Sequence, residues 1–89
     1  MYQLKLEPRV EKTLAHLALD TRRRIAAEIE TLAEDPRPAD CMPVRAAPRG
    51  TFRIRVGDWR VIYVVDDVDH KVTIARVARR KGDTYRRLR

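Results

Sequence analysis

In the second half of the chain, apolar and polar side chains alternate on both sides of the dipeptide Gly57-Asp58. A period of two is typical of a β-strand with one buried face, and a two-residue connection of this composition favours a β-hairpin. Because the connections between these segments are short and contain no helical pattern, we expect the strands to be antiparallel. The predicted strands are Thr51–Val56, Trp59–Val65 and Val72–Val77.

Gly57 and Asp58, taken as the turn, fix the register of the two strands that they join. Arg55 then faces Arg60, and Arg53 lies on the same side of the sheet. A shift of one residue would bury these three arginines, so we expect the register that leaves them exposed. The opposite face, which is predicted to be buried, carries Phe52, Ile54, Val56, Trp59, Val61 and Tyr63.

The first half of the chain has a helical period after a short alternating segment at Tyr2–Leu6. Val10, Leu14 and Leu17 follow the spacing i, i+4, i+7, which predicts the apolar side of a short helix. A second helix is predicted to begin with Asp20 as its N-cap and to end before a pair of prolines. Its predicted buried residues are Ile25, Ile29, Leu32 and Ala33, and its predicted end is near Glu34 or Asp35.

A proline-rich segment connects the helices to the sheet, and Val44 within it predicts a brief edge strand. The two helices are separated by a very short turn, so we expect them to form an antiparallel hairpin. Their apolar sides need a partner, and the sheet offers one apolar face. The sequence therefore predicts one domain over residues 1–89. Its fold class is α+β, with an N-terminal helical hairpin packed as a second layer on a small antiparallel sheet.

Positive charge is concentrated in the half of the chain that contains the predicted strands. Residues 50–89 hold eleven Lys or Arg against five Asp or Glu, whereas residues 1–49 hold nine against eight, and the net charge is +7. Sixteen of the cations are arginines, whose planar guanidinium suits phosphates and base edges. The excess favours a polyanionic partner, and nucleic acid before a membrane surface. The alternative is a solvated basic face that has no ligand.

The remaining side chains do not indicate metal or redox chemistry. Cys41 is the only cysteine, so no internal disulfide can form, which is typical of a reducing compartment. With His16 and His70 as the only histidines we expect no metal site, and no glycine-rich motif indicates a cofactor. No apolar run approaches the length of a membrane span. The sequence predicts a cytoplasmic protein without metal, cofactor or membrane contact.

Three more arginines lie in and after the last predicted strand, and they extend the charge of the hairpin. Along an extended chain Arg76 and Arg80 fall on one side and Arg79 on the other. Tyr85 follows five residues after Arg80. Its spacing alone favours a residue that packs the C-terminal end against the sheet.

The run Phe52–Tyr63, read as a whole, resembles the central signature of the RelE/ParE toxin superfamily. Leu32–Pro38 resembles the helix end and proline turn of that superfamily. Val77–Arg80, together with Tyr85 and Arg86, resembles its closing strand and tail. The resemblance covers nearly the whole chain in the family's order and implies a RelE-like fold.

For the RelE-type branch, the resemblance implies a toxin of a type II toxin–antitoxin pair that cleaves messenger RNA on the ribosome and thereby inhibits translation. The implied enzyme is an endoribonuclease, or mRNA interferase. In it the ribose 2′-hydroxyl attacks the adjacent phosphate without a metal ion. The implied partners are the ribosome, its mRNA and a cognate antitoxin, which would form a toxin–antitoxin hetero-oligomer.

Carried over by motif position, the resemblance also assigns roles to single residues. Arg60 and Arg80 would stabilise the charge on the phosphate in the transition state. Arg53 and Arg55 would hold flanking phosphates and orient the strand, so that Arg55 counts among the catalytic residues as well. Tyr85 would stack on a base or assist proton transfer. Further RNA contacts are expected from Arg76, Arg79 and Lys81.

The chain departs from the family pattern at two places. Some ribonuclease members carry lysine where this chain has Arg53 and Arg55, and arginine does not give up its proton in proteins. The general base is therefore left to Tyr85, a water molecule or a ribosomal group. Other branches place a histidine near Arg79, and this chain does not.

Two other functions stay open. The ParE branch shares the scaffold but inhibits DNA gyrase and is not a nuclease. The tail from Arg79 to Tyr85 favours the RelE branch, because paired arginines and a tyrosine suit RNA chemistry. A basic RNA- or ribosome-binding module without catalysis is the second alternative, since no acid–base pair is evident in the sequence.

Overall fold

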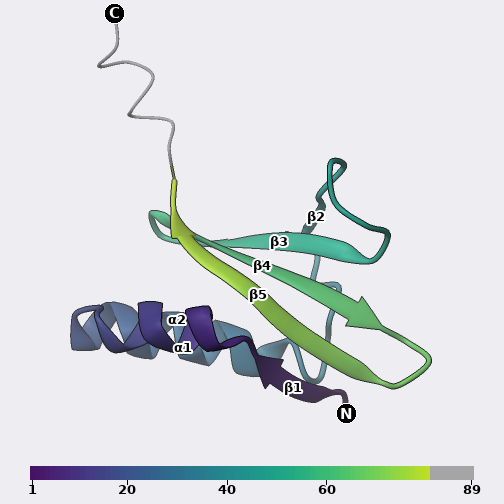
Figure 1. The fold of residues 1–89 in the computed structure, drawn as a ribbon, viewed down its shortest axis with the longest axis horizontal. Helices are drawn as coiled ribbons and strands as arrows, with labels where there is room; N and C mark the ends of the chain where they lie inside the picture. The colour runs from purple at the N-terminus through teal and green to yellow at the C-terminus, as the bar shows by residue number, and fades with distance from the viewer. Residues whose placement is uncertain (81–89) are drawn as a thin grey trace, which may run out of the picture.

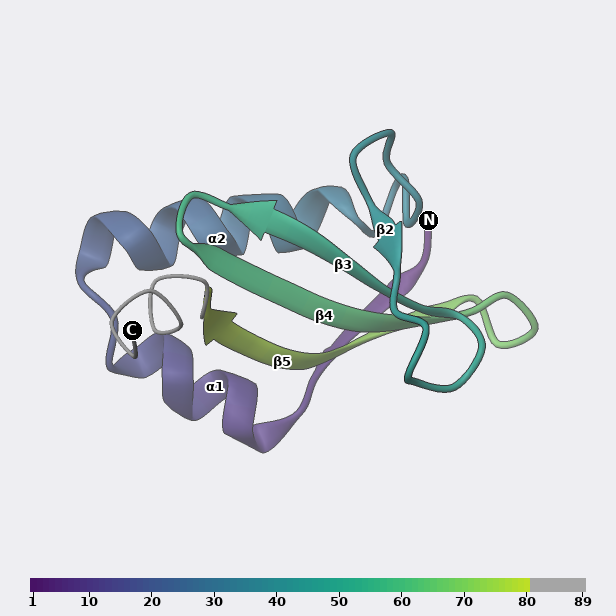
Figure 2. The ribbon, with the colours of Figure 1, turned by 90° about the horizontal axis from the view of Figure 1, so that it is seen from above.

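The computed structural model describes residues 1–80 of the chain, in which two helices cover one face of a sheet (Figure 1). Seen from above, the helices run in opposite directions beneath the strands (Figure 2). The predicted two-layer α+β fold with a helical hairpin is confirmed. The elements are β1 (Gln3–Leu6), α1 (Pro8–Ala15), α2 (Leu19–Thr31), β2 (Met42–Pro43), β3 (Thr51–Val56), β4 (Trp59–Asp66) and β5 (Lys71–Arg79).

The five strands form a mixed sheet in the order β1-β5-β4-β3-β2. The strands β2 to β5 pair antiparallel, as predicted for the three long ones. β1 pairs parallel with β5, so the prediction of an antiparallel sheet is wrong for this strand. Parallel neighbours need a long connection, and here both helices and the other strands lie between β1 and β5 in the chain.

The hairpin of β3 and β4 has the predicted register. Gly57 has φ of +60°, a conformation that glycine adopts without strain and that favours a tight hairpin turn. β3 has the predicted bounds, and β4 extends one residue further than predicted, to Asp66. The paired residues are Val56 with Trp59, Arg55 with Arg60, Ile54 with Val61, Arg53 with Ile62 and Phe52 with Tyr63.

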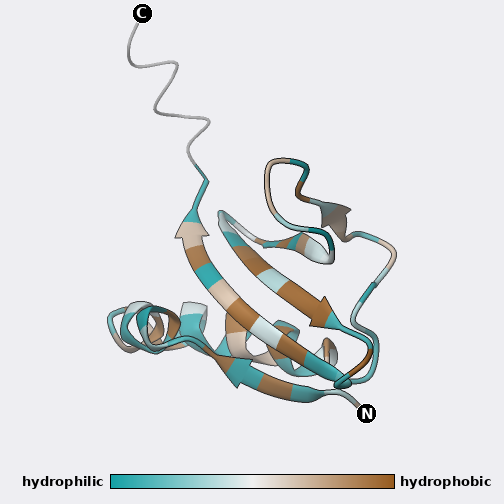
Figure 3. Cartoon of the chain, turned by 45° about the vertical axis from the view of Figure 1, so that its right-hand side comes forward, coloured by the Kyte–Doolittle hydropathy of each residue, from teal (hydrophilic) through white to brown (hydrophobic). Residues whose placement is uncertain are grey.

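The hydrophobic core lies between the helical hairpin and the face of the sheet that the hairpin covers. Apolar and polar residues alternate along the strands, so that one face of each strand is apolar (Figure 3). The predicted buried side of α2 is confirmed, since Ile25, Ile29, Leu32 and Ala33 are at most 7% exposed. From α1, Val10 is fully buried. The sheet contributes Ile54, Val56, Val61, Tyr63, Val65, Val72, Ile74 and Val77.

The helix boundaries differ in detail from the prediction. α2 begins at Leu19 with Ala18 in the cap position, so the prediction that Asp20 is the N-cap is wrong. Asp20 lies in the first turn instead, where its carboxylate interacts favourably with the helix dipole. The helix proper ends at Thr31, and its turns continue until the N–H of Asp35 donates to the carbonyl of Thr31 at 3.0 Å.

The edge strand also differs from the prediction. β2 consists of Met42 and Pro43, one residue before Val44, so the predicted position is wrong by a small margin. The N–H of Val44 nevertheless donates to the carbonyl of Thr51 at 2.9 Å. A strand this short, with a proline in it, is typical of a sheet edge.

β5 contains a β-bulge, which the predicted regular strand over Val72–Val77 did not include. Ile62 pairs with Arg76 while its neighbour Tyr63 pairs with Ile74, so Ala75 is an extra residue on β5. Burial follows the same break: Ile74 is buried and the next buried residue is Val77, three positions later. The bulge therefore reverses which side chains of β5 face the helices.

A polar group, which we call the turn cluster, consists of Tyr2, Arg37 and Asp67 at the end of β4 that carries the β4–β5 turn. The Tyr2 hydroxyl donates to Asp67 Oδ1 at 2.6 Å, and Arg37 Nη2 donates to Asp67 Oδ2 at 2.7 Å. The bonds from Arg37 and Tyr2 lower the pKa of the Asp67 carboxyl. The ring of His70 stacks on Tyr2, with 3.8 Å between centroids. The turn cluster ties the N-terminus and the segment after α2 to the turn.

Candidate nucleic-acid interface

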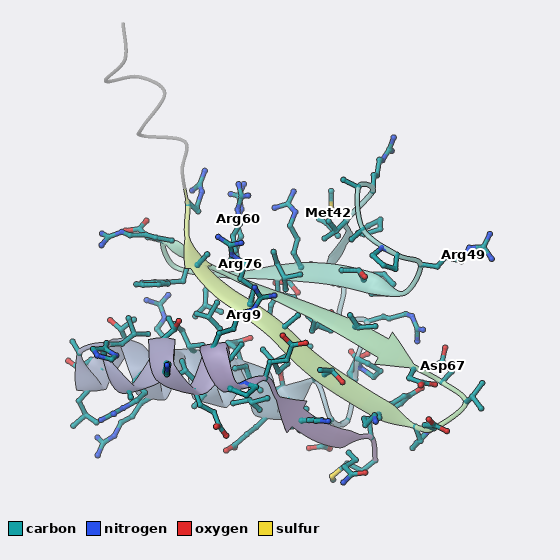
Figure 4. The ribbon with its side chains drawn as sticks, viewed as in Figure 1. Arg9, Met42, Arg49, Arg60, Asp67 and Arg76 are labelled. Atoms are coloured by element: carbon teal, nitrogen blue, oxygen red, sulfur yellow. The ribbon has the colours of Figure 1, made fainter. Side chains whose placement is uncertain are left out.

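Four arginines from three strands lie on the face of the sheet that the helices do not cover. We call this set the arginine face, and its members are Arg53 and Arg55 of β3, Arg60 of β4 and Arg76 of β5. Arg55 and Arg60 are direct cross-strand partners, and Ile62 of β4 pairs with Arg53 on one side and Arg76 on the other. Figure 4 shows Arg60 and Arg76 together above the sheet, away from the helices. The register therefore places Arg53, Arg55 and Arg60 on one side of the hairpin, as predicted.

The arginine face contains two shallow hollows. Arg53 and Arg55 line one of about 430 Å³, whose other walls are Asp40, Met42 and Ile54. The second hollow, of about 240 Å³, is lined by Arg60, Ile62, Arg76, Ala78 and Arg79. The larger hollow is therefore lined by two arginines and the smaller one by three, in each case beside apolar side chains, an arrangement that suits a phosphate and its attached sugar.

The charges of the arginine face are not neutralised within the part of the chain that the structure describes. Ion pairs between residues 1–80 are those of Arg9 with Glu7 and of Arg37 with Asp67. Asp40 borders the larger hollow without forming an ion pair to it. Like charges that face each other across strands destabilise a sheet by roughly 0.2–1 kcal/mol per pair. As far as residues 1–80 are concerned the face keeps this repulsion, which an anion from outside would relieve.

Arg60 is the most constrained member of the arginine face. Its side chain is half-buried, and its Nε is buried without a hydrogen-bond partner among the described residues. A buried donor that lacks an acceptor costs about 1–3 kcal/mol. Because the inner part of the guanidinium is already out of water, the side chain loses less freedom when it binds an anion. Arg60 is thus preorganised, and its Nε is unsatisfied within residues 1–80.

Arg79 lies apart from the four. It pairs with Trp59 on the helix side of the sheet, and its guanidinium carbon is 5.9 Å from the Trp59 ring centroid. Both residues line a pocket of about 440 Å³ between the α1–α2 turn and the β3–β4 turn. Trp59 also packs against the core, as predicted. Arg79 borders the smaller hollow as well, so it connects this end pocket to the edge of the arginine face.

The other predicted site residues are at or beyond the end of β5. The N–H of Arg80 donates to the carbonyl of Asp58 at 2.8 Å, which holds Arg80 beside the β3–β4 turn. Continued alternation after the bulge puts Arg80 on the side of Arg76. Lys81 and Tyr85 lie outside the described residues.

The residues that shape the site without carrying its charge were not predicted from the sequence. Asp40 and Met42 line the larger hollow from the edge of the sheet, and no local pattern pointed to them. The bulge at Ala75 had a signal, because the apolar spacing changes from two to three between Ile74 and Val77. That spacing alone does not say which residue is extra.

No three His, Cys, Asp or Glu side chains within residues 1–80 gather closely enough to hold a metal ion. None of the helices in that range is sufficiently long and apolar to span a bilayer. The guanidinium groups of the arginine face can bind an anion electrostatically.

Comparison with known sequences identifies the family. The sequence model of the ParE toxin of the type II toxin–antitoxin system parDE matches residues 4–84. The RelE1 toxin of Methanocaldococcus jannaschii is 29% identical over 83 residues, which are 91% of this chain and 92% of that protein. The RelE toxin of Mycobacterium tuberculosis is 43% identical over 44 residues, 49% of this chain and 44% of that protein.

Solved structures of RelE toxins have the same fold. The RelE–RelB complex of Pyrococcus horikoshii contains a chain with a TM-score of 0.81 and 29% identity, matched over 91% of this chain and 97% of that one. The isolated RelE toxin of E. coli has a TM-score of 0.78 over 100% of both chains, and at 19% identity it supports the fold. This chain therefore belongs to the ParE toxin family of type II toxin–antitoxin systems, on the RelE-type side of the RelE/ParE superfamily that its hairpin sequence resembles.

Proposed function

We propose that the protein is a ribosome-dependent endoribonuclease that acts in the cytoplasm and inhibits translation by cutting messenger RNA. The observation that carries this proposal is the arginine face, where four guanidinium groups from three strands lie without ion-pair partners among residues 1–80. A phosphodiester strand is a ligand that satisfies several such groups at once. The RelE relatives and the RelE-type signature of the hairpin support the same reading.

The proposed reaction uses the RNA itself as nucleophile. The ribose 2′-oxygen attacks the adjacent phosphorus, its proton passes to a base, and the bond from phosphorus to the 5′-oxygen breaks. The leaving 5′-oxygen takes up a proton, so that the products are a 2′,3′-cyclic phosphate and a 5′-hydroxyl. Negative charge accumulates on the equatorial phosphate oxygens in the transition state, and preorganised cations lower its energy.

Arg60 is the proposed main electrostatic catalyst, because it is half-buried and its Nε has no acceptor among the described residues. Arg80 acts with it at the end of β5, and Arg55, directly across from Arg60, is the third catalytic cation. Arg53 and Arg76 bind the flanking phosphates, and Arg79 and Lys81 are proposed as further RNA contacts. Tyr85 is the proposed stacking or proton-transfer residue.

The general base is the part of the mechanism that the arginine face does not supply. Arginine stays protonated in proteins, so neither Arg53 nor Arg55 can accept the 2′-hydroxyl proton. The proposal assigns this step to Tyr85, a water molecule or a ribosomal group. A nuclease of this kind works mainly by orienting the RNA and stabilising charge, and it depends on the ribosome to present the strand.

We also propose a cognate antitoxin as the protein partner. The P. horikoshii structure is a complex of RelE with RelB, and an E. coli relative was solved as an intact RelBE complex. An acidic or amphipathic segment of an antitoxin would match the positive charge of this chain and compete with RNA for the arginine face. Binding would also stabilise the thin core of a domain of this size.

Inhibition of DNA gyrase is the second candidate, because the matching family model is that of ParE toxins. The two functions are separated by one experiment with purified protein. Ribosomes programmed with a defined message are assayed for cleavage, and gyrase is assayed in parallel for supercoiling. We expect cleaved message and normal supercoiling.

The same assay is run on Arg60→Ala, which is expected to lose most of the cleavage, and on Arg23→Ala as its matched control. Arg23 is exposed on α2, away from the arginine face, so Arg23→Ala removes the same charge and is expected to leave cleavage intact. Intact message together with blocked supercoiling would assign the protein to gyrase inhibition. RNA or ribosome binding without cleavage would instead indicate a non-catalytic binding module.

A further inference from the structure

β5 changes face partway along its length, and the arginine face depends on this change. In an unbroken strand the side chain two positions after the buried Ile74 would also point toward the helices. The extra residue Ala75 turns Arg76 to the opposite side, and Val77 continues the buried row. Bulges of this kind redirect side chains beside functional sites. Whatever stabilises the bulge therefore also sets the direction of Arg76.

Arg9 makes a direct hydrogen bond to the bulge. Its Nε–H, from the first turn of α1, donates to the carbonyl oxygen of Ala75 at 2.8 Å. The Glu7 carboxylate lies 3.5 Å from the same nitrogen. Figure 4 places Arg9 below Arg76, between α1 and the sheet. Arg9 thus contacts the bulge from the side opposite to the arginine face.

The backbone explains why a side chain supplies this bond. β1 runs alongside β5 but ends at Leu6, and the N–H of Glu7 donates to the carbonyl of Ile74 at 3.1 Å. α1 begins at the next residue, Pro8, so the chain leaves the edge of β5 there. The backbone of β1 therefore cannot continue the pairing to Ala75, and Arg9 provides the donor.

We propose that Arg9 is a positioning residue of the arginine face, which holds the Ala75 bulge and thereby directs Arg76 toward RNA phosphates. This inference rests on the proposed function for its substrate. Arg9 acts through Arg76, which shares the smaller hollow with Arg60, and does not itself touch RNA. The competing role for Arg9 is that of one more cation that attracts RNA by its charge alone.

Two substitutions separate these roles. Arg9→Gln places an amide N–H at the chain position of Nε and removes the charge. Arg9→Met has the same length at that position but has neither donor nor charge. We expect Arg9→Met to lower kcat/KM for cleavage about 10-fold and Arg9→Gln to stay within about 2-fold of the wild type. Equal losses in the two variants would show that charge is what matters and would overturn the proposal.

A double-mutant cycle tests whether Arg9 works through Arg76. In an Arg76→Ala background, Arg9→Met should cause no further loss of kcat/KM, because the side chain that it positions is already absent. Additive losses would contradict the inference. Arg23→Met serves as the control for loss of one exposed charge and should leave the rate unchanged in both backgrounds.

A measurement without cleavage keeps the inference separate from the proposed function. The backbone amide resonances of residues 74–77 should move in Arg9→Met and stay in place in Arg9→Gln. For a single-stranded oligoribonucleotide, the slope of log affinity against log salt should fall by about 0.7 in Arg9→Met, through loss of the phosphate contact of Arg76, and should stay at the wild-type value in Arg9→Gln. Unchanged resonances and slope would refute the role of Arg9. A wild-type protein that fails to cut message would refute only the nuclease proposal.

Discussion

Arginine is used in two opposite ways at the two ends of β4. In the turn cluster, Arg37 is bound by the Asp67 carboxylate at 2.7 Å, and the Tyr2 hydroxyl binds the same carboxylate at 2.6 Å. On the arginine face, Arg55 and Arg60 stand directly opposite each other with no ion-pair partner in the described part of the chain. The paired arginine holds segments of the fold together, whereas the unpaired ones are available to a ligand. Composition alone does not distinguish these two uses.

The largest expected effect is on activity at the unpaired end. Arg60→Ala should reduce ribosome-dependent cleavage by about 100-fold, because it removes a preorganised cation from the transition state. The melting temperature should not fall, because the substitution also removes a buried donor that lacks an acceptor among residues 1–80 and the repulsion with Arg55. A variant that unfolds would show instead that Arg60 is structural and would erase the contrast with Arg37.

A charge reversal should convert one use of arginine into the other. In Arg55→Glu the new carboxylate faces Arg60 across the strands and should stabilise the sheet by roughly 0.2–1 kcal/mol. Cleavage should fall by about 10-fold or more, because the catalytic cation is then engaged internally. Chemical denaturation measures the stability, and the cleavage assay measures the activity, of the same preparation. Lower stability together with lower activity would contradict this prediction.

A smaller effect is expected for a cation that binds RNA without entering the chemistry. Arg53→Ala should weaken binding of a single-stranded oligoribonucleotide and reduce the salt slope of log affinity by about 0.7. The maximal cleavage rate on ribosomes should be close to that of the wild type. If the slope is unchanged, Arg53 does not contact a phosphate.

The smallest effect is expected in the turn cluster, where pairing is exposed to solvent. Because the pKa of Asp67 is lowered in the fold, its contribution to stability is present above the pKa of the unfolded chain. That contribution is lost as pH falls through the lower folded value. Asp67→Asn should therefore melt slightly below the wild type at neutral pH, and the difference should shrink in acid. Cleavage should be unaffected. A difference that does not depend on pH would mean that the charge is not involved.

The sequence predicted the arginine side of the hairpin correctly because two signals agreed there. Gly57 supplied the turn, and the alternation around it left one register in which Arg53, Arg55 and Arg60 avoid burial. The contribution of Arg76 was harder to predict. Its direction depends on one inserted residue, and the apolar spacing around Ala75 fits more than one position for the bulge.

Contacts between distant segments were not predictable from local patterns. The alternation at Tyr2–Leu6 indicated a strand but not its parallel partner β5. The bonds that join Tyr2 and Arg37 to Asp67 link residues that are 65 and 30 positions apart. The start of α2 was missed for a local reason, since a good capping residue one position inside a helix looks the same in sequence as a cap.

The central claim is that the unpaired arginines, and not the paired one, receive the RNA. Titration of ¹⁵N-labelled protein with a short single-stranded RNA, followed through the arginine Nε–H resonances, tests it directly. The resonances of Arg60, Arg55 and Arg76 should shift together and saturate, while that of Arg37 stays in place. Saturating shifts at Arg37, or at exposed helix arginines such as Arg23, with Arg60 unmoved, would contradict the account.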